Sequence, residues 1–168
     1  MLFRSEQALA CYQKALELEP ESTYALGSLG ALYRKLMRLQ DAMECLNKAV
    51  AIDPTFAGGY WNRSQLLLLQ GEYKQGWQEY EARHKAPEYI QKFGQRTFSK
   101  PRWQGEEIND KTLLVYTEQG HGDAMQFCRY LPLLKQRVKN IVFECKPPLT
   151  RLMKGLPGDI PLVEQNED

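Results

Sequence analysis

The residues with the clearest chemical potential lie in one short loop, residues 118–123, with the sequence EQGHGD. Its two glycines allow a tight turn and let a ligand come close to the backbone, and Asp123 is well placed to cap a helix that follows. The start of such a helix presents unpaired N–H groups and a partial positive charge to a ligand. The candidate ligand-binding loop comprises Gln119, Gly120, His121 and Gly122. A turn that binds nothing remains the alternative, since glycines and a capping aspartate are common in strand-to-helix turns.

The segments around this loop alternate between strand and helix patterns. Residues 112–117 (TLLVYT) and 140–145 (NIVFEC) are short apolar runs that predict buried strands, and IPLV near the C-terminus predicts a third. A helix is expected over 123–139 with a kink at Pro132, and a short helix is expected after Pro147 and Pro148. This order predicts a right-handed parallel βαβαβ unit, a partial Rossmann-like α/β domain over 112–168. Because three strands make half of a doubly wound domain, we expect the sequence to be truncated at this end.

The nucleotide-binding signal in this α/β segment is incomplete. A GxGxxG fingerprint needs glycine or alanine at position 125, where Met125 stands. Glu144, near the end of the second expected strand, could act as a ribose-binding acid. Half of the motif is a weak indication of nucleotide binding.

The N-terminal half of the chain is organised by a repeat over residues 23–56. Small and apolar residues recur at spacings of three and four on an expected first helix, and a second helix ends before Pro54. Gly30 and Ala42 are small enough to let the two helices approach closely. The frame positions are Leu26, Leu29, Gly30, Tyr33, Ala42, Leu46, Ala49 and Pro54. This is the pattern of a tetratricopeptide (TPR) repeat, a helix-turn-helix unit of 34 residues.

The same frame extends in both directions. Residues 1–22 match the second helix of an earlier repeat, and residues 57–87 match a weaker repeat in which Arg63 and Arg83 replace expected apolar and small residues. An α-helical TPR solenoid over 1–85 is therefore expected. Since the first repeat lacks its own first helix, we expect a fragment of a longer protein. The apolar side of the helix that opens the chain is then expected to be exposed, which supports self-association. That side comprises Leu9, Tyr12 and Leu16.

Residues 86–111 break the helical period. They combine proline, glycine and charge with isolated aromatic residues such as Phe98 and Trp103. Because these aromatic residues are too apolar for a flexible tether, we expect a packed connector that fixes the angle between two domains.

Composition narrows the class of function. Of the 168 residues, 43% are hydrophobic and 26% charged, and 22 Lys and Arg residues face 21 Asp and Glu residues, which gives a net charge of +1. This balance offers no sign of a nucleic-acid partner, and no apolar run reaches transmembrane length. The four widely spaced cysteines predict buried free thiols and no disulfide or metal site. We therefore expect a cytoplasmic protein with no membrane partner, metal or cofactor.

The run PRWQGEEINDKTLLVYTEQGHGDAMQFCRYLPLL, with GYWNRSQLLLLQGEYKQGWQEYEARH before it, resembles bacterial TPR proteins that carry a glycosyltransferase-like domain. That domain is similar to heptosyltransferases and, more distantly, to O-GlcNAc transferases, which share the two-Rossmann GT-B architecture. The resemblance implies that Asp123 is the catalytic base for the acceptor hydroxyl. His121 departs from the aliphatic residue expected there. The C-terminal Rossmann half, which supplies most of the nucleotide-sugar site in this architecture, is not in these residues, so the chain alone is expected to be inactive and the nucleotide-sugar to bind only to the full-length parent.

Two functions remain open at this point. In the first, the TPR part recruits a protein acceptor and the α/β part is the acceptor-side half of a nucleotide-sugar-dependent transferase. In the second, the chain is a non-catalytic protein-protein interaction module whose α/β part is structural. The partner groove is expected along the first helices of the repeats, at Tyr24, Ser28, Trp61, Asn62 and Gln65.

The amide of Asn62 carries the most specific expectation for this groove. The resemblance places it where O-GlcNAc transferases form an asparagine ladder that holds a peptide backbone through paired donor and acceptor groups. An ordinary exposed helix face remains the alternative for Trp61 and Asn62. No lysine stands where a peptide-carboxylate clamp needs one, which disfavours a receptor for chaperone tails.

Overall fold

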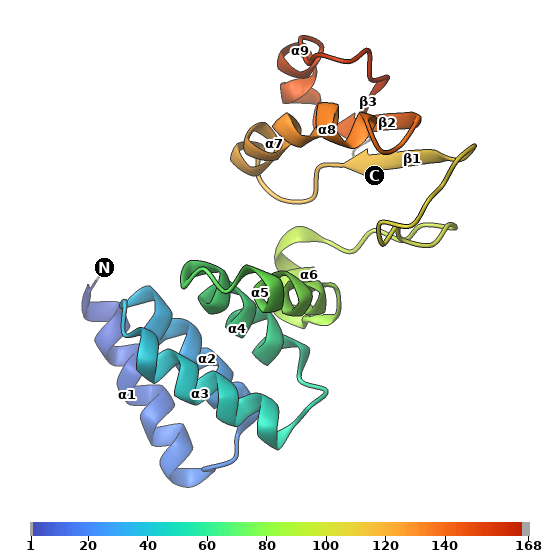
Figure 1. The fold of residues 1–168 in the computed structure, drawn as a ribbon. Helices are drawn as coiled ribbons and strands as arrows, with labels where there is room; N and C mark the ends of the chain where they lie inside the picture. The colour runs from blue at the N-terminus through green and yellow to red at the C-terminus, as the bar shows by residue number, and fades with distance from the viewer. Residues whose placement is uncertain (1, 166–168) are drawn as a thin grey trace. The chain divides into compact units, whose positions relative to one another are not determined.

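A computed structural model describes residues 2–165 of the chain (Figure 1). It divides into two compact units at the bond between Gln95 and Arg96. The first is helical and the second combines a small parallel sheet with short helices. The expected order, a helical repeat region followed by a partial α/β unit, is confirmed. No helix within residues 2–165 combines the length and the apolar character that crossing a membrane requires.

The helical unit stacks antiparallel helices in chain order, as Figure 1 shows. They are α1 (Leu2–Leu18), α2 (Thr23–Lys35), α3 (Leu39–Ile52), α4 (Ala57–Leu69), α5 (Tyr73–Tyr80) and α6 (Pro87–Phe93), with a 3-10 turn, η1 (Glu81–Lys85), before α6. The boundaries of α2 and α3 fall within the expected repeat, and Pro54 lies just beyond the end of α3. Proline has no backbone N–H to continue a helix, which is why the second helix stops there.

The core of the helical unit forms where α2, α3 and α4 meet. It is built from Leu29, Tyr33, Ala42, Leu46 and Leu66. A Cβ atom placed on Gly30 would lie 2.6 Å from Cγ of Leu46, a distance that real Cβ atoms do not tolerate. The expected close approach of the two helices through small residues is therefore confirmed, and it depends on the missing side chain at position 30.

The expectation that the apolar side of the first helix is exposed is wrong. Leu9, Tyr12 and Leu16 are half-buried and pack against the core that α2, α3 and α4 form. The reason is that the helix pair of the following repeat covers this side of α1. The premise for self-association through these three residues is therefore absent.

The third repeat keeps its helix pair despite the two arginines. Arg63 forms a two-pronged ion pair with Glu79 on α5, with Nη2 and Nε 2.7 and 2.9 Å from the two carboxylate oxygens. Arg83, which is 4% exposed, donates to the carbonyl oxygen of Tyr80 at 3.0 Å, where α5 gives way to the 3-10 turn. Each guanidinium pairs with a carboxylate, Arg63 with Glu79 and Arg83 with Glu81, and this pairing offsets the free-energy cost of burying the charge.

The expected connector, residues 86–111, begins with a helix. Pro87 occupies the first turn of α6, a position that suits proline because its missing N–H would be unpaired there. The division between the two units falls inside this segment, after Gln95. Residues 96–103 then belong to the α/β unit, where Phe98 lies 5.1 Å from the ring of Tyr116.

The α/β unit contains the three strands that the sequence predicts. They are β1 (Thr112–Tyr116), β2 (Asn140–Cys145) and β3 (Leu162–Glu164), all parallel and in the order β1-β2-β3. Tyr116 is in register with Glu144, so the strands β1 and β2 end side by side. Burial alternates along β2, where Ile141, Phe143 and Cys145 point into the core.

The expected helix over 123–139 is instead broken into three short pieces. They are α7 (His121–Phe127), the 3-10 turn η2 (Cys128–Tyr130) and α8 (Leu131–Lys135). Pro132 lies in the first turn of α8, so it begins a helix where a kink in the middle of one was expected. The expected short helix after Pro147 and Pro148 is present as η3 (Pro147–Leu149) and α9 (Thr150–Met153).

The four cysteines are free thiols. Cys145 is buried, and burial raises its thiol pKa. The expectation of buried thiols is confirmed for Cys145 alone, since Cys45 and Cys128 are half-buried and Cys11 is exposed on α1.

Candidate functional site

The loop that follows β1 is built around the start of α7. The helix begins at His121, and Gly120 precedes it in an extended conformation. Asp123 therefore occupies the third helical position and not the expected cap position. Its Oδ2 reaches back to accept a hydrogen bond from the backbone N–H of Gly120 at 3.0 Å. The carboxylate is exposed, and its second oxygen is open to solvent or to a ligand.

A lysine that the sequence did not single out completes this loop. Lys146 follows β2, and its Nζ lies 2.6 Å from the backbone oxygen of Gln119. Thr117, at the end of β1, is 7% exposed, and its hydroxyl is buried without a hydrogen-bond partner among the described residues. The carboxyl edge of the sheet thus gathers a cation, a buried hydroxyl and a carboxylate, Asp123, around two glycines.

Glu144 does not stand free for a ribose hydroxyl. Both of its carboxylate oxygens bind the guanidinium of Arg96, at 2.5 and 3.2 Å. Arg96 also lies over the rings of Phe98 and Tyr116, each 5.0 Å from its centroid. The interpretation of Glu144 as a ribose-binding acid is therefore wrong, because a residue from outside the motif occupies its carboxylate.

The residues expected to line a partner groove lie on α2 and α4, which pack against each other along a seam. Tyr24, at the start of α2, has 61% of its surface exposed, and Ser28 is half-buried one turn later. Asn62 of α4 points toward α2, where its amide nitrogen lies 3.5 Å from the backbone oxygen of Gly27. This distance is at the outer limit for a hydrogen bond, so the amide retains most of its capacity to bind a ligand.

Gln65 has both ends of its amide occupied. Its nitrogen donates to the carbonyl oxygen of Trp61 at 3.3 Å, and its oxygen accepts from Nη2 of Arg34 at 3.1 Å. Gln65 therefore serves to hold Arg34 across the seam. Sequence reasoning missed Arg34, and the spacing of the repeat frame gave no sign of this contact, which joins residues 31 positions apart.

Trp61 is partly covered by the helix that follows the third repeat. Its ring meets that of Tyr89 on α6 edge to face, with centroids 5.3 Å apart, and it is half-buried. Such edge-to-face contacts are stabilising in their own right. The structure thus brings Asn62 and Gln65 together on the seam with Arg34, and gives Trp61 a partly structural role.

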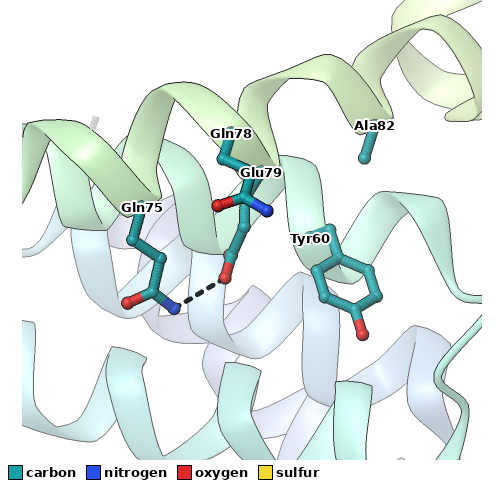
Figure 2. A pocket seen from close by; sticks show the side chains of 5 residues that line it. All are labelled: Tyr60, Gln75, Gln78, Glu79 and Ala82. Atoms are coloured by element: carbon teal, nitrogen blue, oxygen red, sulfur yellow. Dashed lines mark hydrogen bonds between the residues drawn. The ribbon is translucent and has the colours of Figure 1, made fainter.

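An open hollow lies between α4 and α5, and none of the predicted site residues lines it. Figure 2 shows Gln75, Gln78 and Glu79 of α5 lining the hollow beside Tyr60 of α4, with the amide of Gln75 directed at Glu79. Gln75 donates to Glu79 at 2.8 Å, and the same carboxylate pairs with Arg63. The charge in this hollow is therefore neutralised by the protein itself.

Comparison with known families identifies the helical repeats. A tetratricopeptide repeat model matches residues 23–56, and a second model of the same description matches residues 2–22. Residues 2–56 are tetratricopeptide repeats. The repeat unit and its frame, as predicted from Leu26 to Pro54, are confirmed.

Two relatives illustrate what the chain is similar to. Protein FlbA of Caulobacter vibrioides is 22% identical over 173 aligned positions, which cover 78% of this chain and 28% of FlbA. The Hsp70-Hsp90 organizing protein of Triticum aestivum is 25% identical over 76 positions, covering 45% of this chain and 13% of that protein. The chain therefore spans less than a third of each of these curated relatives.

Among solved structures, the chain is similar to a variant of the O-GlcNAc transferase of Thermobaculum terrenum. The match covers 85% of this chain and 34% of that chain, with 16% sequence identity and a TM-score of 0.41. A likeness at this level carries no argument about activity, which must come from the residues of the sites themselves.

Proposed function

We propose that the TPR unit binds an extended segment of a partner protein along the seam between α2 and α4. The observation that carries the proposal is the amide of Asn62, which lies on the seam with one long contact of 3.5 Å and has further donor and acceptor capacity to offer. An amide can satisfy both the N–H and the C=O of a peptide backbone, which is the requirement for holding an extended chain. The exposed ring of Tyr24 adds apolar area on the same helix layer.

Calorimetry with peptides selected from a random library on the whole chain tests this proposal. Asn62→Ala should weaken a selected peptide by about 1 kcal/mol, because one hydrogen-bonding amide is lost. Gln40→Ala is the matched control, since Gln40 lies on α3 and its amide donates to Glu44 on the same helix. Equal affinities for Asn62→Ala and the wild type would make the seam an ordinary helix surface.

We propose a second function for the α/β unit, as the acceptor-side half of a nucleotide-sugar-dependent glycosyltransferase. The open carboxylate oxygen of Asp123, at the carboxyl edge of the sheet, is suited to accept a proton from an attacking hydroxyl. The nucleotide-sugar donor would be bound mainly by parts of the protein outside these residues. Lys146, beside the same loop, adds positive charge where an anionic group of a substrate could bind.

An assay with radiolabelled nucleotide-sugars, on the 168-residue chain and on the full-length protein, tests the second function. In the full-length protein Asp123→Asn should abolish most of the transfer while peptide affinity stays unchanged, because the two sites use different units. Full activity of Asp123→Asn would leave the loop as a structural turn. No transfer by the wild-type full-length protein would favour the alternative, a non-catalytic interaction module.

A further inference from the structure

Arg34 is held on the seam between α2 and α4 without a carboxylate partner. It lies in the last turn of α2 and is half-buried. Its Nη2 donates to the amide oxygen of Gln65, and its Nε is buried with no partner among the described residues. Its Nη1 makes no hydrogen bond there and is not buried. Among the described residues, the amide oxygen of Gln65 is thus the group that pairs with this cation.

The arginines of the described chain differ in their partners, and Arg129 and Arg137, which are more exposed than Arg34, donate to backbone oxygens. Four of them pair with a carboxylate: Arg38 with Asp41, Arg63 with Glu79, Arg83 with Glu81, and Arg96 with Glu144. Burial lowers the pKa of Arg34, because a charge that has lost hydration is penalised. Taking a charged group partly out of water without an opposite charge costs free energy, which a carboxylate from outside would recover.

The helices around Arg34 leave this positive charge uncompensated. Neither α2 nor α4 contains an aspartate or glutamate, and α2 ends on Arg34 and Lys35. The dipole at the end of α2 supplies roughly half a negative charge against these two cations, so this end of α2 keeps a net positive charge. The second helix α3, by contrast, carries both Asp41 and Glu44.

We propose that Arg34 selects a carboxylate side chain, of aspartate or glutamate, in the extended partner segment. This inference rests on the proposed binding of a protein segment to the seam. Nη1 is the donor available to the incoming carboxylate, while Gln65 keeps the guanidinium plane fixed. Because the planar group is already oriented, little side-chain freedom is lost when the pair forms, and the pair is partly shielded from solvent.

The test uses the whole chain and a random library of peptides of about 12 residues, a length that spans the seam when extended. The peptides are amidated at the C-terminus, so that only side chains supply carboxylates. Selection should return peptides with an aspartate or glutamate. Replacing that acid by its amide should weaken binding about tenfold, the effect of losing one charge-assisted hydrogen bond.

Protein variants then assign the effect to Arg34. With Arg34→Gln the acidic peptide and its amide version should bind equally, and Arg34→Lys should recover only part of the difference because a lysine lacks the planar fork. Lys48→Gln removes the same charge from α3 and should preserve the full difference. Thermal unfolding confirms that each variant folds, and the peptide replacement on the wild-type chain tests the inference even where one does not.

The outcomes separate the two proposals. The carboxylate inference fails if the selected peptides contain no acid. It also fails if they bind Arg34→Gln as tightly as the wild type. If these peptides still lose affinity with Asn62→Ala, the seam remains a peptide-binding surface. Inorganic phosphate that displaces the acidic peptide at equal concentration shows a general anion site and also ends the carboxylate inference. If no peptide binds to the wild-type chain, both proposals fail.

Discussion

The two units of this chain close their cores in different ways. In the helical unit, α2, α3 and α4 surround side chains that have no exposed surface at all, namely Ala42, Leu46, Ala49 and Leu66. In the α/β unit the buried side chains lie against one face of a three-stranded sheet, and Cys145 has no exposed surface there. Both units also expose large apolar side chains, for example Met37 and Tyr73 in the helical unit and Tyr130 and Leu133 in the α/β unit.

The difference follows from how each fold is encoded. A repeat buries its residues against helices that are adjacent in sequence, so each unit supplies its own local cover. A parallel sheet needs strands that are separated by a whole crossover, and its core forms only when distant segments meet. We therefore expect the core contacts of the helical unit to join helices that are adjacent in sequence, and those of the α/β unit to join segments that are distant in sequence.

The largest expected loss of stability comes from truncating one buried side chain in the core of each unit. Leu46→Ala and Ile141→Ala each remove a fully buried side chain, one in each unit, and each should cost about 3 kcal/mol of unfolding free energy. Hydrogen exchange with mass spectrometry on the whole chain should show faster exchange in α2–α4 for the first variant and in β1 and β2 for the second. Faster exchange across both units in either variant would contradict their separate cores.

A smaller effect is expected from adding one methyl group at a glycine. Gly30→Ala should destabilise the helical unit by about 2 kcal/mol, because the new Cβ lies 2.6 Å from Leu46, a side chain with no space to move. Gly122→Ala is the control in the α/β unit, where nothing lies within 4 Å of the added atom. Urea unfolding followed by circular dichroism should show a lower midpoint only for Gly30→Ala. Equal midpoints would mean that α2 and α3 are not closely packed at this point.

The smallest of these effects concerns the ion pair in each unit. Glu79→Gln should cost about 1.5 kcal/mol, because the side chains of Arg63 and Glu79 are only 14% and 10% exposed and the cation loses its partner. Glu144→Gln should cost about 0.5 kcal/mol, since Arg96 is 38% exposed and water replaces much of the interaction. Thermal unfolding at low and high salt measures both. A larger loss for Glu144→Gln would reverse the ranking of the two pairs.

What the sequence predicts well is what depends on near neighbours. The spacing of Leu26, Leu29 and Tyr33 sets one face of a helix, and Gly30 opposite Leu46 sets the distance to the next, so the repeat can be derived from local pattern. The strands were also predictable, because β1 and β2 are short apolar runs bounded by turn residues.

What the sequence did not predict depends on contacts between distant residues. The pairing of Glu144 with Arg96 joins residues 48 positions apart, and the contact of Lys146 with Gln119 joins residues 27 apart. The break of the expected long helix near Pro132 was missed because a proline permits either a kink within a helix or the start of a new one. Periodicity does not distinguish these two outcomes.

The measurement that tests the account most directly is a map of backbone amide chemical shifts by nuclear magnetic resonance, with and without a saturating selected peptide. The account predicts that the largest changes fall on α2 and α4 around Asn62, Gln65 and Arg34, with little change on α3 and in β1–β3. Changes concentrated on α5 at the hollow of Figure 2, or on the loop at residues 118–123, would contradict the central claim that the seam between α2 and α4 is the partner-binding surface.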